Sequence, residues 1–329
     1  MKTDKKRKKI TVLGGGTGTF VVLSGLKRYD DLSLSVIVSM TDSGGSTGKL
    51  RDQLGVLPPG DLRQCLLALS EASMNWRKLF LYRFDSGDLK GHNFGNIFLA
   101  ALEKICFSYD EVVNFASILL KTKGEVIPVT KDKTHLVAYY ENGKVVEREG
   151  LIDENKGEKS KIKKLSLKPN VFALKKAVET IKKSDFLVIG PGDLYTSIIP
   201  VLLPIGIVEA VKCFQGKIIY IMNLMTKAGQ TYNYKASDHL RDLEKYLKRK
   251  IDIILINNEK INQKILNIYQ KYDEIKVVND LEKDRYKIIE TDLLDNREFK
   301  KDSSDILYRS ILRHDSNKLA RVLIKIFYA

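Results

Sequence analysis

The stretch ITVLGGGTGTF, residues 10–20, decides the fold of this chain. Its apolar start, 10–13, predicts a buried strand, and the apolar segment 20–26 behind the glycines predicts a helix. A second apolar run, 34–40, ends at Asp42 and predicts the next strand. Strand, glycine turn, helix and strand form the opening of a parallel βαβ unit. We therefore expect an α/β fold with a mostly parallel sheet.

The glycine turn has the chemistry of a phosphate-binding loop. Glycine lets the backbone adopt positive φ and approach a ligand without a Cβ clash, and the N–H groups that begin the following helix attract anions. The spacing is not GxGxxG, because Thr19 occupies the position of the third glycine. A relaxed dinucleotide-type turn and a simple tight turn between strand and helix both remain open. The candidate residues are Gly14, Gly15, Gly16, Thr17, Gly18 and Thr19.

One segment interrupts the alternation of strands and helices. A hairpin signal at Asn142-Gly143 lies among short strand-like pieces, which predicts an antiparallel excursion. The charged segment that follows, 154–164, predicts a loop. The strand-like pieces are 126–129, 136–140 and 144–149.

The alternation elsewhere predicts a doubly wound, mostly parallel sheet covered on both faces. We expect a basic tail, 1–9, and then a single α/β domain, 10–329, with a β-rich insertion at about 125–165. The other predicted elements are helices at 62–69, 96–105, 110–121, 172–183, 198–213 (one or two helices), 237–248 and 263–272, strands at 186–189, 217–222, 251–257, near 275–278 and near 286–290, and a final helix from Ser304 or Asp315.

Composition indicates an ordinary globular protein. Of the 329 residues, 43% are hydrophobic and 29% charged, which is enough apolar material for a large core. The three cysteines are far apart and lack a CxxC spacing, so a disulfide framework and a zinc site are disfavoured and a reducing cytoplasm fits. Glycines interrupt the apolar run behind the basic N-terminus, and prolines interrupt 198–211, so neither a signal peptide nor a membrane span is expected.

The net charge of +15 raises the possibility of nucleic-acid binding. The excess is mostly lysine, spread over surface-type positions, and no zinc finger or basic motif with interleaved aromatic residues accompanies it. We therefore expect no specific nucleic-acid binding, whereas a field of this sign attracts small anions.

Four predicted strand ends carry polar, glycine-bearing segments: 14–19, 41–48, 190–197 and 223–231. Ligands of such sheets bind beyond the carboxyl ends of the strands. The convergence of four such ends predicts the binding site better than any single motif does.

The second of these segments resembles a Walker A loop only superficially. The glycine before Gly48-Lys49 is one residue too close and Leu50 stands where Ser or Thr is needed, so a P-loop ATPase is rejected. We interpret it as a mobile loop that contacts an anion. Asp42 could bind a ribose hydroxyl or a divalent metal, or simply cap the next element. The candidate residues are Asp42, Ser43, Gly44, Gly45, Ser46, Lys49 and Arg51.

Two further polar segments precede predicted helices. Asp61 and Arg63 either face the cleft or serve as a helix cap and a solvated side chain. The segment GHNFGN, 91–96, places polar side chains at a helix N-terminus, which favours a ligand site over a structural role; its candidates are His92, Asn93 and Asn96.

The third and fourth strand ends complete the candidate site. Hydroxyls at 196 and 197 can bond phosphate oxygens or cap a helix. No nucleophile–base pair stands at a recognisable spacing, so the sequence gives no support to Ser/His/Asp or Cys/His chemistry. The candidate residues are Gly190, Gly192, Asp193, Tyr195, Thr196, Ser197, Asn223 and Thr226.

Seven ordered segments resemble the gluconeogenesis factor family (YvcK-type) of the CofD-like superfamily. They span roughly residues 10–240 and read VLGGGTGTF, DSGGSTGKLR, LPPGDLRQCLLAL, YRF, GHNFGN, LVIGPGDLYTSIIP and NLMTKAGQTYNYKASDH. The resemblance implies a Rossmann-like core that binds nucleotide-containing ligands. A better-known relative transfers 2-phospho-L-lactate from a nucleotide donor with a divalent metal, whereas this branch is associated with UDP-sugar binding, gluconeogenic growth and control of cell shape and wall synthesis.

Two departures from the family pattern concern the candidate site. The branch commonly has two aspartates before the paired glycines, and here the pair reads Asp42-Ser43, which removes one carboxylate from a metal-assisted transfer. Asn93 stands where serine is usual, a tolerable polar exchange. Neither departure argues against nucleotide binding.

The resemblance and the residues together give a leading hypothesis and an alternative. The leading one is a cytoplasmic regulatory protein without catalytic activity that binds UDP-N-acetylglucosamine across the strand ends and needs no cofactor; a homo-oligomer is compatible with it. The alternative is a CofD-like transferase that uses a nucleotide donor and Mg²⁺, with Asp42, Asp61 and Asp193 as metal ligands; phosphoryl transfer needs positioning and charge neutralisation more than a nucleophile. Protein partners are not specified by the sequence.

Overall fold

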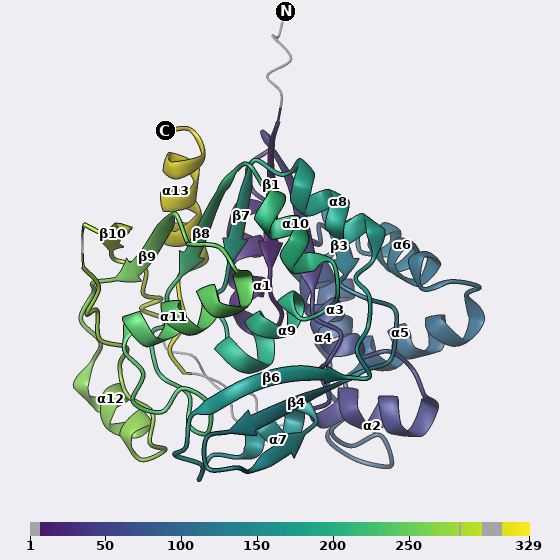
Figure 1. Ribbon diagram of the computed structural model, residues 1–329. Helices are drawn as coiled ribbons and strands as arrows, with labels where there is room; N and C mark the ends of the chain where they lie inside the picture. Colours follow the sequence, from purple (N-terminus) through teal and green to yellow (C-terminus); the bar gives the residue numbers. More distant parts are fainter. Residues whose placement is uncertain (1–6, 283, 298–310) are drawn as a thin grey trace, which may run out of the picture.

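The computed structural model describes residues 7–282, 284–297 and 311–329, and its centre is a seven-stranded parallel sheet (Figure 1). The strand order is β10-β9-β8-β7-β1-β2-β3, with every neighbouring pair parallel. The order therefore reverses between β1 and β7, where Leu13 pairs with Ile189 at the carboxyl ends. The strands are β1 Lys8–Leu13, β2 Leu32–Val38, β3 Glu125–Pro128, β7 Phe186–Ile189, β8 Lys217–Ile221, β9 Ile253–Asn257 and β10 Lys287–Thr291.

Helices cover both faces of the sheet, as the doubly wound prediction requires. On one face α1 packs against α3 and α13, and on the other α10 packs against α8 and α11 (Figure 1). The helical elements are α1 Gly16–Leu26, α2 Gly45–Leu54, α3 Pro59–Leu69, α4 Met74–Leu81, α5 Phe94–Ile105, α6 Tyr109–Leu119, α7 Glu149–Glu154, α8 Lys175–Lys183, the π-helix η1 Leu194–Ile198, α9 Ile199–Leu202, α10 Ile207–Cys213, α11 Ala236–Leu247, α12 Gln263–Gln270 and α13 Ser316–Phe327.

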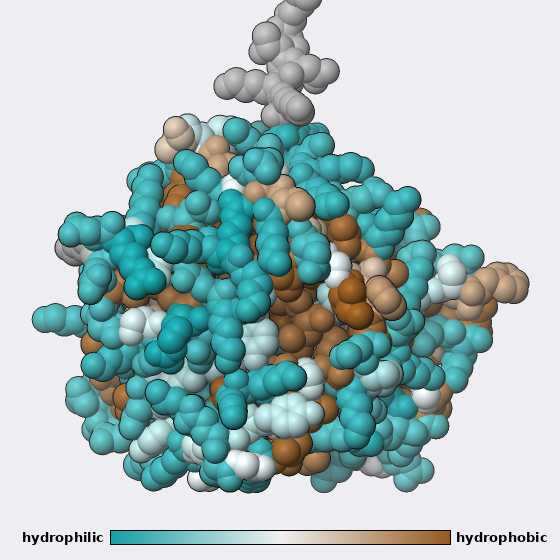
Figure 2. Space-filling model, in the orientation of Figure 1, coloured by the Kyte–Doolittle hydropathy of each residue, from teal (hydrophilic) through white to brown (hydrophobic). Residues whose placement is uncertain are grey.

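The central strands are apolar throughout because both of their faces are covered. Every residue of β7 and of β9 is buried, which is the pattern of a parallel sheet between two helical layers. The face shown in Figure 2 is mostly hydrophilic, with a hydrophobic area near its centre. In the described residues, no helix is long and apolar enough to cross a membrane.

A small antiparallel sheet of three strands, in the order β5-β4-β6, sits at the carboxyl edge of the large one (Figure 1). Its strands are β4 His135–Tyr140, β5 Val145–Glu147 and β6 Ile162–Lys168. The hairpin predicted at Asn142-Gly143 is confirmed, because β4 and β5 pair antiparallel on either side of it and Gly143 has φ +87°.

Two predictions about this excursion were wrong. Residues 125–128 are not part of it, since β3 pairs parallel with β2 in the large sheet. The segment expected as a loop, 154–164, contains the end of α7 and the start of β6. Hydrophobic periodicity missed β6 because buried Ile162 and Leu165 are separated by exposed lysines.

Other boundaries also shifted. Lys8 and Lys9, assigned to a basic tail, belong to β1 and pair with Leu32 and Ser33; residues 1–6 lie outside the described part. The strand expected near 275–278 is reduced to an isolated bridge between Met225 and Lys276. The final helix begins after Asp315, which accepts hydrogen bonds from the N–H groups of Asn317 and Lys318; Ser304 lies outside the described residues.

Candidate functional site

A cleft of about 590 Å³ lies beyond the carboxyl ends of the parallel strands. The segments that follow β1, β2, β7 and β8 all line it, so the structure brings together the four polar strand ends that were expected to converge. Ligands of doubly wound sheets bind where the strand order reverses, and small-molecule sites measure about 300–1,000 Å³. The cleft has both the position and the size of a ligand site.

The cleft takes up most of the residues proposed from the sequence. Those that line it are Gly15, Gly16, Thr17, Gly18, Asp42, Gly44, Gly45, Ser46, Asp61, Arg63, Asn96, Gly192, Asp193, Thr196, Ser197, Asn223 and Thr226. Those that do not line it are Gly14, Thr19, Ser43, Lys49, Arg51, His92, Asn93, Gly190 and Tyr195.

The glycine turn packs directly against the turn that follows β7. A Cβ atom on Gly18 would lie 1.9 Å from the carbonyl oxygen of Pro191, so a side chain at this position does not fit. Helix α1 begins without a side-chain cap, and the N–H of Gly16 donates to Asp61 Oδ1 at 2.8 Å. The next N–H groups have no acceptor within the helix. Since Thr17 and Gly18 lie on the cleft wall, this helix start can meet an anion.

Two carboxylates face this turn. Burial raises the pKa of Asp42 and of Asp61, and the neighbouring Asp42 carboxylate contributes to the rise at Asp61, whose pKa reaches about 7. Glycines make room for the pair: a Cβ on Gly15 would lie 2.2 Å from Asp61 Oδ2, and a Cβ on Gly60 would lie 2.2 Å from Asp42 Oδ2. Near neutral pH the pair therefore carries less than its full charge, which reduces its repulsion of a phosphate.

The prediction of a mobile loop at 42–49 was wrong. Helix α2 begins at Gly45, with Gly44 as its N-cap. Asp42 Oδ1 accepts the N–H of Gly44 at 3.0 Å in the turn before the helix, and α2 itself begins without a side-chain cap. Arg51 donates to the carbonyls of Asp42 at 2.9 Å and Thr134 at 2.9 Å, so it fastens α2 to its surroundings instead of facing the cleft. Periodicity missed α2 because its first turn is glycine, serine and threonine.

In the GHNFGN segment, Asn96 lines the cleft, whereas His92 and Asn93 lie behind the cleft wall. Asn93 caps α5, with its Oδ1 accepting the Asn96 N–H at 3.2 Å and its Nδ2 donating to the Leu81 carbonyl at 3.0 Å. Asn96 reaches the cleft wall, and its Oδ1 accepts from Arg63 Nε at 2.7 Å.

His92 in the same segment is buried beside α2. Its Nδ1 lies 3.3 Å from Ser46 Oγ, a Ser–His contact that the sequence did not reveal because the two residues are far apart along the chain. The same Ser46 oxygen accepts the N–H of Asn93 at 3.2 Å, and both Ser46 and His92 are almost fully buried. The contact therefore holds α2 against the segment that precedes α5.

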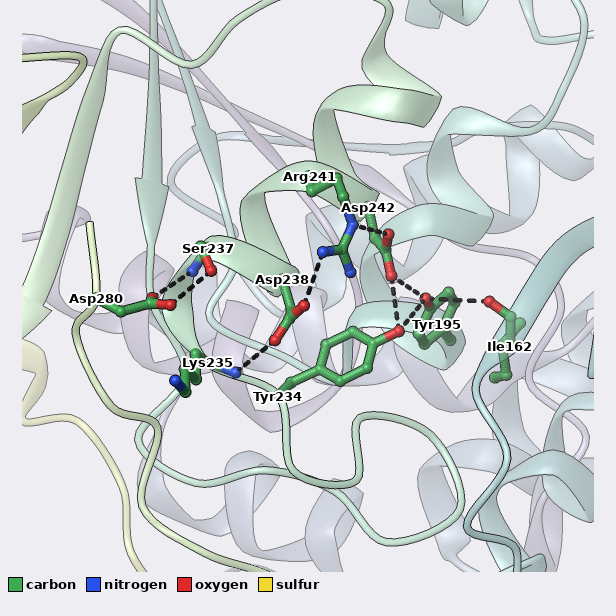
Figure 3. Close-up of polar contacts among 9 residues, drawn as sticks. All are labelled: Ile162, Tyr195, Tyr234, Lys235, Ser237, Asp238, Arg241, Asp242 and Asp280. Atoms are coloured by element: carbon green, nitrogen blue, oxygen red, sulfur yellow. Dashed lines mark hydrogen bonds and ion pairs between the residues drawn. The ribbon is translucent and has the colours of Figure 1, made fainter. Parts of the chain in front are cut away.

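Tyr195 points away from the cleft, toward α11 (Figure 3). Its hydroxyl lies 2.5 Å from Asp242 Oδ2 and 3.0 Å from the Tyr234 hydroxyl, which itself lies 2.7 Å from the same carboxylate oxygen. A weaker contact, 3.5 Å, reaches the carbonyl of Ile162 in β6. Tyr195 thus positions the β7 turn, whereas its neighbours Thr196 and Ser197 line the cleft.

The loop after β8 forms the opposite wall. Asn223 Nδ2 donates to the Gly192 carbonyl at 2.7 Å and ties this loop to the β7 turn. Within the described part of the chain, Asn223 Oδ1 is buried without a hydrogen-bond partner, so an acceptor remains available at the cleft. Thr226 Oγ1 accepts the Ile275 N–H at 2.9 Å, so its hydroxyl holds the β8 loop to the backbone at Ile275.

Sequence reasoning missed several charged residues at the cleft, among them Glu149, Asp153 and Lys227. Glu149 Oε2 accepts the Ser43 N–H at 3.1 Å, and burial raises its pKa well above the usual range. Lys227 Nζ lies 3.1 Å from Asp153 Oδ1. Glu149 and Asp153 belong to α7 in the insertion, where the strand-end argument does not apply. Lys227 lies in the segment NLMTKAGQTYNYKASDH, and the resemblance of this segment to the family is the signal that could have pointed to it.

The part of the chain that the structure describes contains no metal site built by three side chains. Among the described residues, no three His, Cys, Asp or Glu side chains are grouped so that they could hold a metal ion. Asp61 accepts the Gly16 N–H, and Asp193 Oδ2 lies 3.7 Å from Lys227 Nζ. This geometry does not favour a site shared by Asp42, Asp61 and Asp193; Asp42 with a phosphate-bound Mg²⁺ remains a prediction.

Comparison with known proteins agrees with this architecture. A family described as "2-phospho-L-lactate transferase CofD" matches residues 10–294. A gluconeogenesis factor of Bacillus subtilis is 36% identical over 322 residues, which cover 97% of this chain and 98% of that protein. A protein of Thermotoga maritima that carries the same name provisionally is 40% identical over 318 residues, covering 97% of this chain and 99% of its own.

A solved structure shares the whole fold. The crystal structure of a member of the UPF0052 family from Bacillus halodurans superposes with a TM-score of 0.88 at 35% identity, and the match covers 97% of this chain and 99% of that one. With this fold, a cleft at its switch point and relatives that match over nearly their full length, the chain belongs to the gluconeogenesis factor family of the CofD-like superfamily.

Proposed function

We propose that this protein binds a nucleotide sugar, specifically a UDP-sugar such as UDP-N-acetylglucosamine, and regulates metabolism in the cytoplasm without catalysing a reaction. The observation that carries the proposal is the meeting of two glycine-rich turns, after β1 and after β7, where the strand order reverses. A diphosphate suits this place, since helix N–H groups and the hydroxyls of Thr17 and Ser197 lie around it.

The ends of the cleft offer polar groups for a base and a sugar. Asn96 lies at one side, and Asn223, with its unpartnered buried oxygen, lies at the other. A buried acceptor of this kind favours a ligand that donates an N–H or O–H to it, because leaving it unpaired costs free energy. The choice of a UDP-sugar rests further on the family resemblance, as do the proposed roles in gluconeogenic growth, cell shape and wall synthesis.

The side chains of the cleft favour binding over catalysis. Among the described lining residues the histidine is His314, whose pKa burial lowers to about 4, so it is neutral and a weak base at physiological pH. Thr196 is engaged with Gln230 at 3.2 Å, and Ser46, although it lines the cleft, is 4% exposed and its Oγ accepts the Asn93 N–H. These groups lack the exposed nucleophile with an adjacent base that acyl or glycosyl transfer to the protein would need.

Calorimetric titration with UDP-N-acetylglucosamine tests the proposal, with UMP and NAD⁺ as comparison ligands. We expect saturable heat and a rise in unfolding temperature with the nucleotide sugar. Ser197→Ala should weaken binding, whereas Ser166→Ala in β6, outside the cleft, should not. Neither heat nor a shift of unfolding temperature at millimolar ligand would reject the proposal.

A turnover assay distinguishes the transferase alternative from binding without catalysis. Phosphorus NMR of UDP-N-acetylglucosamine and of a guanine nucleotide donor, incubated with protein and Mg²⁺, should show no new phosphorus signal if the protein only binds. Metal-dependent consumption of either nucleotide, lost in Asp42→Asn, would favour the transferase.

A further inference from the structure

Helix α7 joins the two sides of the cleft, and we call residues 149–154 the α7 strap. At its start Glu149 Oε2 accepts the Ser43 N–H at 3.1 Å, and the Gly150 N–H donates to Ser43 Oγ at 2.9 Å. At its other end Asp153 Oδ1 lies 3.1 Å from Lys227 Nζ and 3.2 Å from Gln230 Nε2. The strap is therefore fastened by polar contacts to the loops after β2 and after β8.

The ammonium of Lys227 sits among three carboxylates. Besides Asp153, Asp193 Oδ2 lies 3.7 Å away, and Glu274 acts on Lys227 at longer range. Burial acts to lower the Lys227 pKa, but these carboxylates outweigh it and raise the pKa, so the ammonium stays charged. Its side chain is 16% exposed and lies on the cleft wall. The carboxylates therefore compete with any phosphate for the Lys227 ammonium, while Lys156, which also lines the cleft, acts on Glu274.

Lys227 has carboxylates as its direct partners. Arg63 donates to the side-chain oxygen of Asn96 and to the Phe80 carbonyl, and its charge also acts on Asp42 and Asp61. Arg83 donates to the Gly91 carbonyl at 2.6 Å. The acceptors of Lys227 are anions, and a phosphate oxygen can replace a carboxylate oxygen at an ammonium with similar charge and distance.

We infer, on the basis of the nucleotide-sugar binding proposed above, that Lys227 binds a phosphate of the ligand and that Asp153 holds the same ammonium until the ligand arrives. A phosphate oxygen can take the place nearest the Lys227 ammonium only if a carboxylate oxygen leaves it. Asp193 follows β7 directly in the main domain, whereas Asp153 belongs to the insertion. Rotation of the Asp153 side chain breaks its bonds to Lys227 and Gln230 together and frees the end of the strap.

This exchange connects the cleft to the outer surface of the insertion. The strap leads through Asn155 into the segment before β6, and the Asn155 carbonyl packs so closely on Gly229 that a Cβ there would lie 2.3 Å from it. When Asp153 releases Lys227, the contact between the insertion and the β8 loop loses this ion pair. A regulatory protein needs such a change, because a protein partner can distinguish the ligand-bound form from the ligand-free form only if a surface differs between them.

The test compares Asp153→Asn with the matched control Asp52→Asn. The control breaks the pair between Asp52 Oδ2 and Arg148, 2.8 Å apart, which lies beside the other end of the strap and away from Lys227. Binding of UDP-N-acetylglucosamine and of inorganic pyrophosphate is measured by calorimetry. We expect Asp153→Asn to bind both about five- to tenfold more tightly than the wild type, as removal of one competing ion pair predicts, and Asp52→Asn to bind like the wild type.

Variants of Lys227 complete the test, with thermal unfolding as the check on folding. Lys227→Met should weaken both probes by about tenfold or more, and Lys227→Arg should restore most of the affinity. If Lys227→Met does not fold, the Asp153→Asn result and hydrogen exchange decide. Exchange at residues 151–157 should become faster when ligand binds to the wild type.

The possible failures are distinguishable. If the wild type binds UDP-N-acetylglucosamine but Asp153→Asn shows no gain, or exchange at 151–157 slows with ligand, the strap inference is wrong and the proposed function stands. A gain for pyrophosphate without any binding of the nucleotide sugar rejects the proposed function and keeps Lys227 as an anion site. No binding of either probe by the wild type or by Asp153→Asn overturns both.

Discussion

At the residue scale, the site depends on glycines that admit close contacts. The turn sequence suggested a phosphate loop, but the decisive contact, Gly18 against the Pro191 carbonyl, joins residues far apart along the chain. No local pattern encodes such a contact, since it arises only when β1 and β7 become neighbours. The sequence therefore singled out the glycines without revealing which of them the fold requires.

Gly18→Ala tests this contact. The added Cβ would lie 1.9 Å from the Pro191 carbonyl oxygen, so the two turns must separate. We expect the free energy of unfolding to fall by about 1–3 kcal/mol, as for other overpacked sites, and nucleotide-sugar affinity to fall with it. Gly157→Ala is the matched control because its Cβ would meet nothing within 4 Å; equal effects of the two variants in denaturant unfolding would contradict the prediction.

The Asp61 carboxyl makes stability depend on pH. Burial first, and then the Asp42 carboxylate, raise its pKa from 3.8 to about 7 in the folded protein. The folded state thus binds more protons than the unfolded state between about pH 4 and pH 7, so this group destabilises the fold increasingly as pH rises through that window. Asp61→Asn, whose amide oxygen can still accept the Gly16 N–H, should stabilise the protein by about 1 kcal/mol or more at pH 8 and hardly at pH 4.

Chemical denaturation at several pH values measures the effect, with Asp132→Asn on the surface as control. A gain that does not depend on pH, or that appears mainly at low pH, would show that Asp61 does not titrate as described.

At the scale of elements, the sequence located the strands and most helices, because long apolar runs bounded by glycine or proline are unambiguous. It failed where short elements carry mixed patterns. Helix α2 starts with small polar residues, and β6 alternates buried apolar residues with lysines. Helix α7 matters most among the failures, because it brings Glu149 and Asp153 to the cleft from an insertion that seemed peripheral.

The Tyr195–Asp242–Tyr234 cluster connects the β7 turn and the β8 loop, whose segments line the cleft, to helix α11. Both hydroxyls meet Asp242 Oδ2 on α11, and they come from the β7 turn and the β8 loop (Figure 3). Asp242→Asn replaces the charged acceptor by a neutral one, and we expect a loss of about 1–3 kcal/mol in the free energy of unfolding. Hydrogen exchange should become faster at 194–198 and at 231–236.

Asp280→Asn is the control for this variant. Asp280 accepts the Ser237 N–H at 2.9 Å and so holds the start of α11, but it touches neither tyrosine. Its exchange effect should stay near 236–239. Faster exchange at 194–198 in the control as well would mean that the cluster does not position the β7 turn specifically.

At the scale of the whole molecule, the distribution of charge bears on its partners. The net charge of +15 suggests polyanions. The segments 161–168 and 245–250, joined where Lys245 Nζ donates to the Lys163 carbonyl, carry seven of the lysines, and we call them the lysine face. On that face Lys161 lies over the ring of Tyr234, Lys164 over Tyr139 and Lys245 over Tyr246. The ring of Tyr234 is itself buried, so it is not available for stacking with a base.

We therefore expect nucleic acid to bind weakly and without sequence preference. Contacts to phosphates alone release counterions, so affinity falls steeply with salt, and binding seen in dilute buffer should be lost by roughly 150 mM salt. Fluorescence anisotropy with a labelled duplex and a labelled single strand, each titrated across salt, measures this. Retention of either oligonucleotide at physiological salt, reduced by charge removal at Lys161 and Lys245, would make the lysine face a true binding surface and add a second anionic partner to the nucleotide sugar.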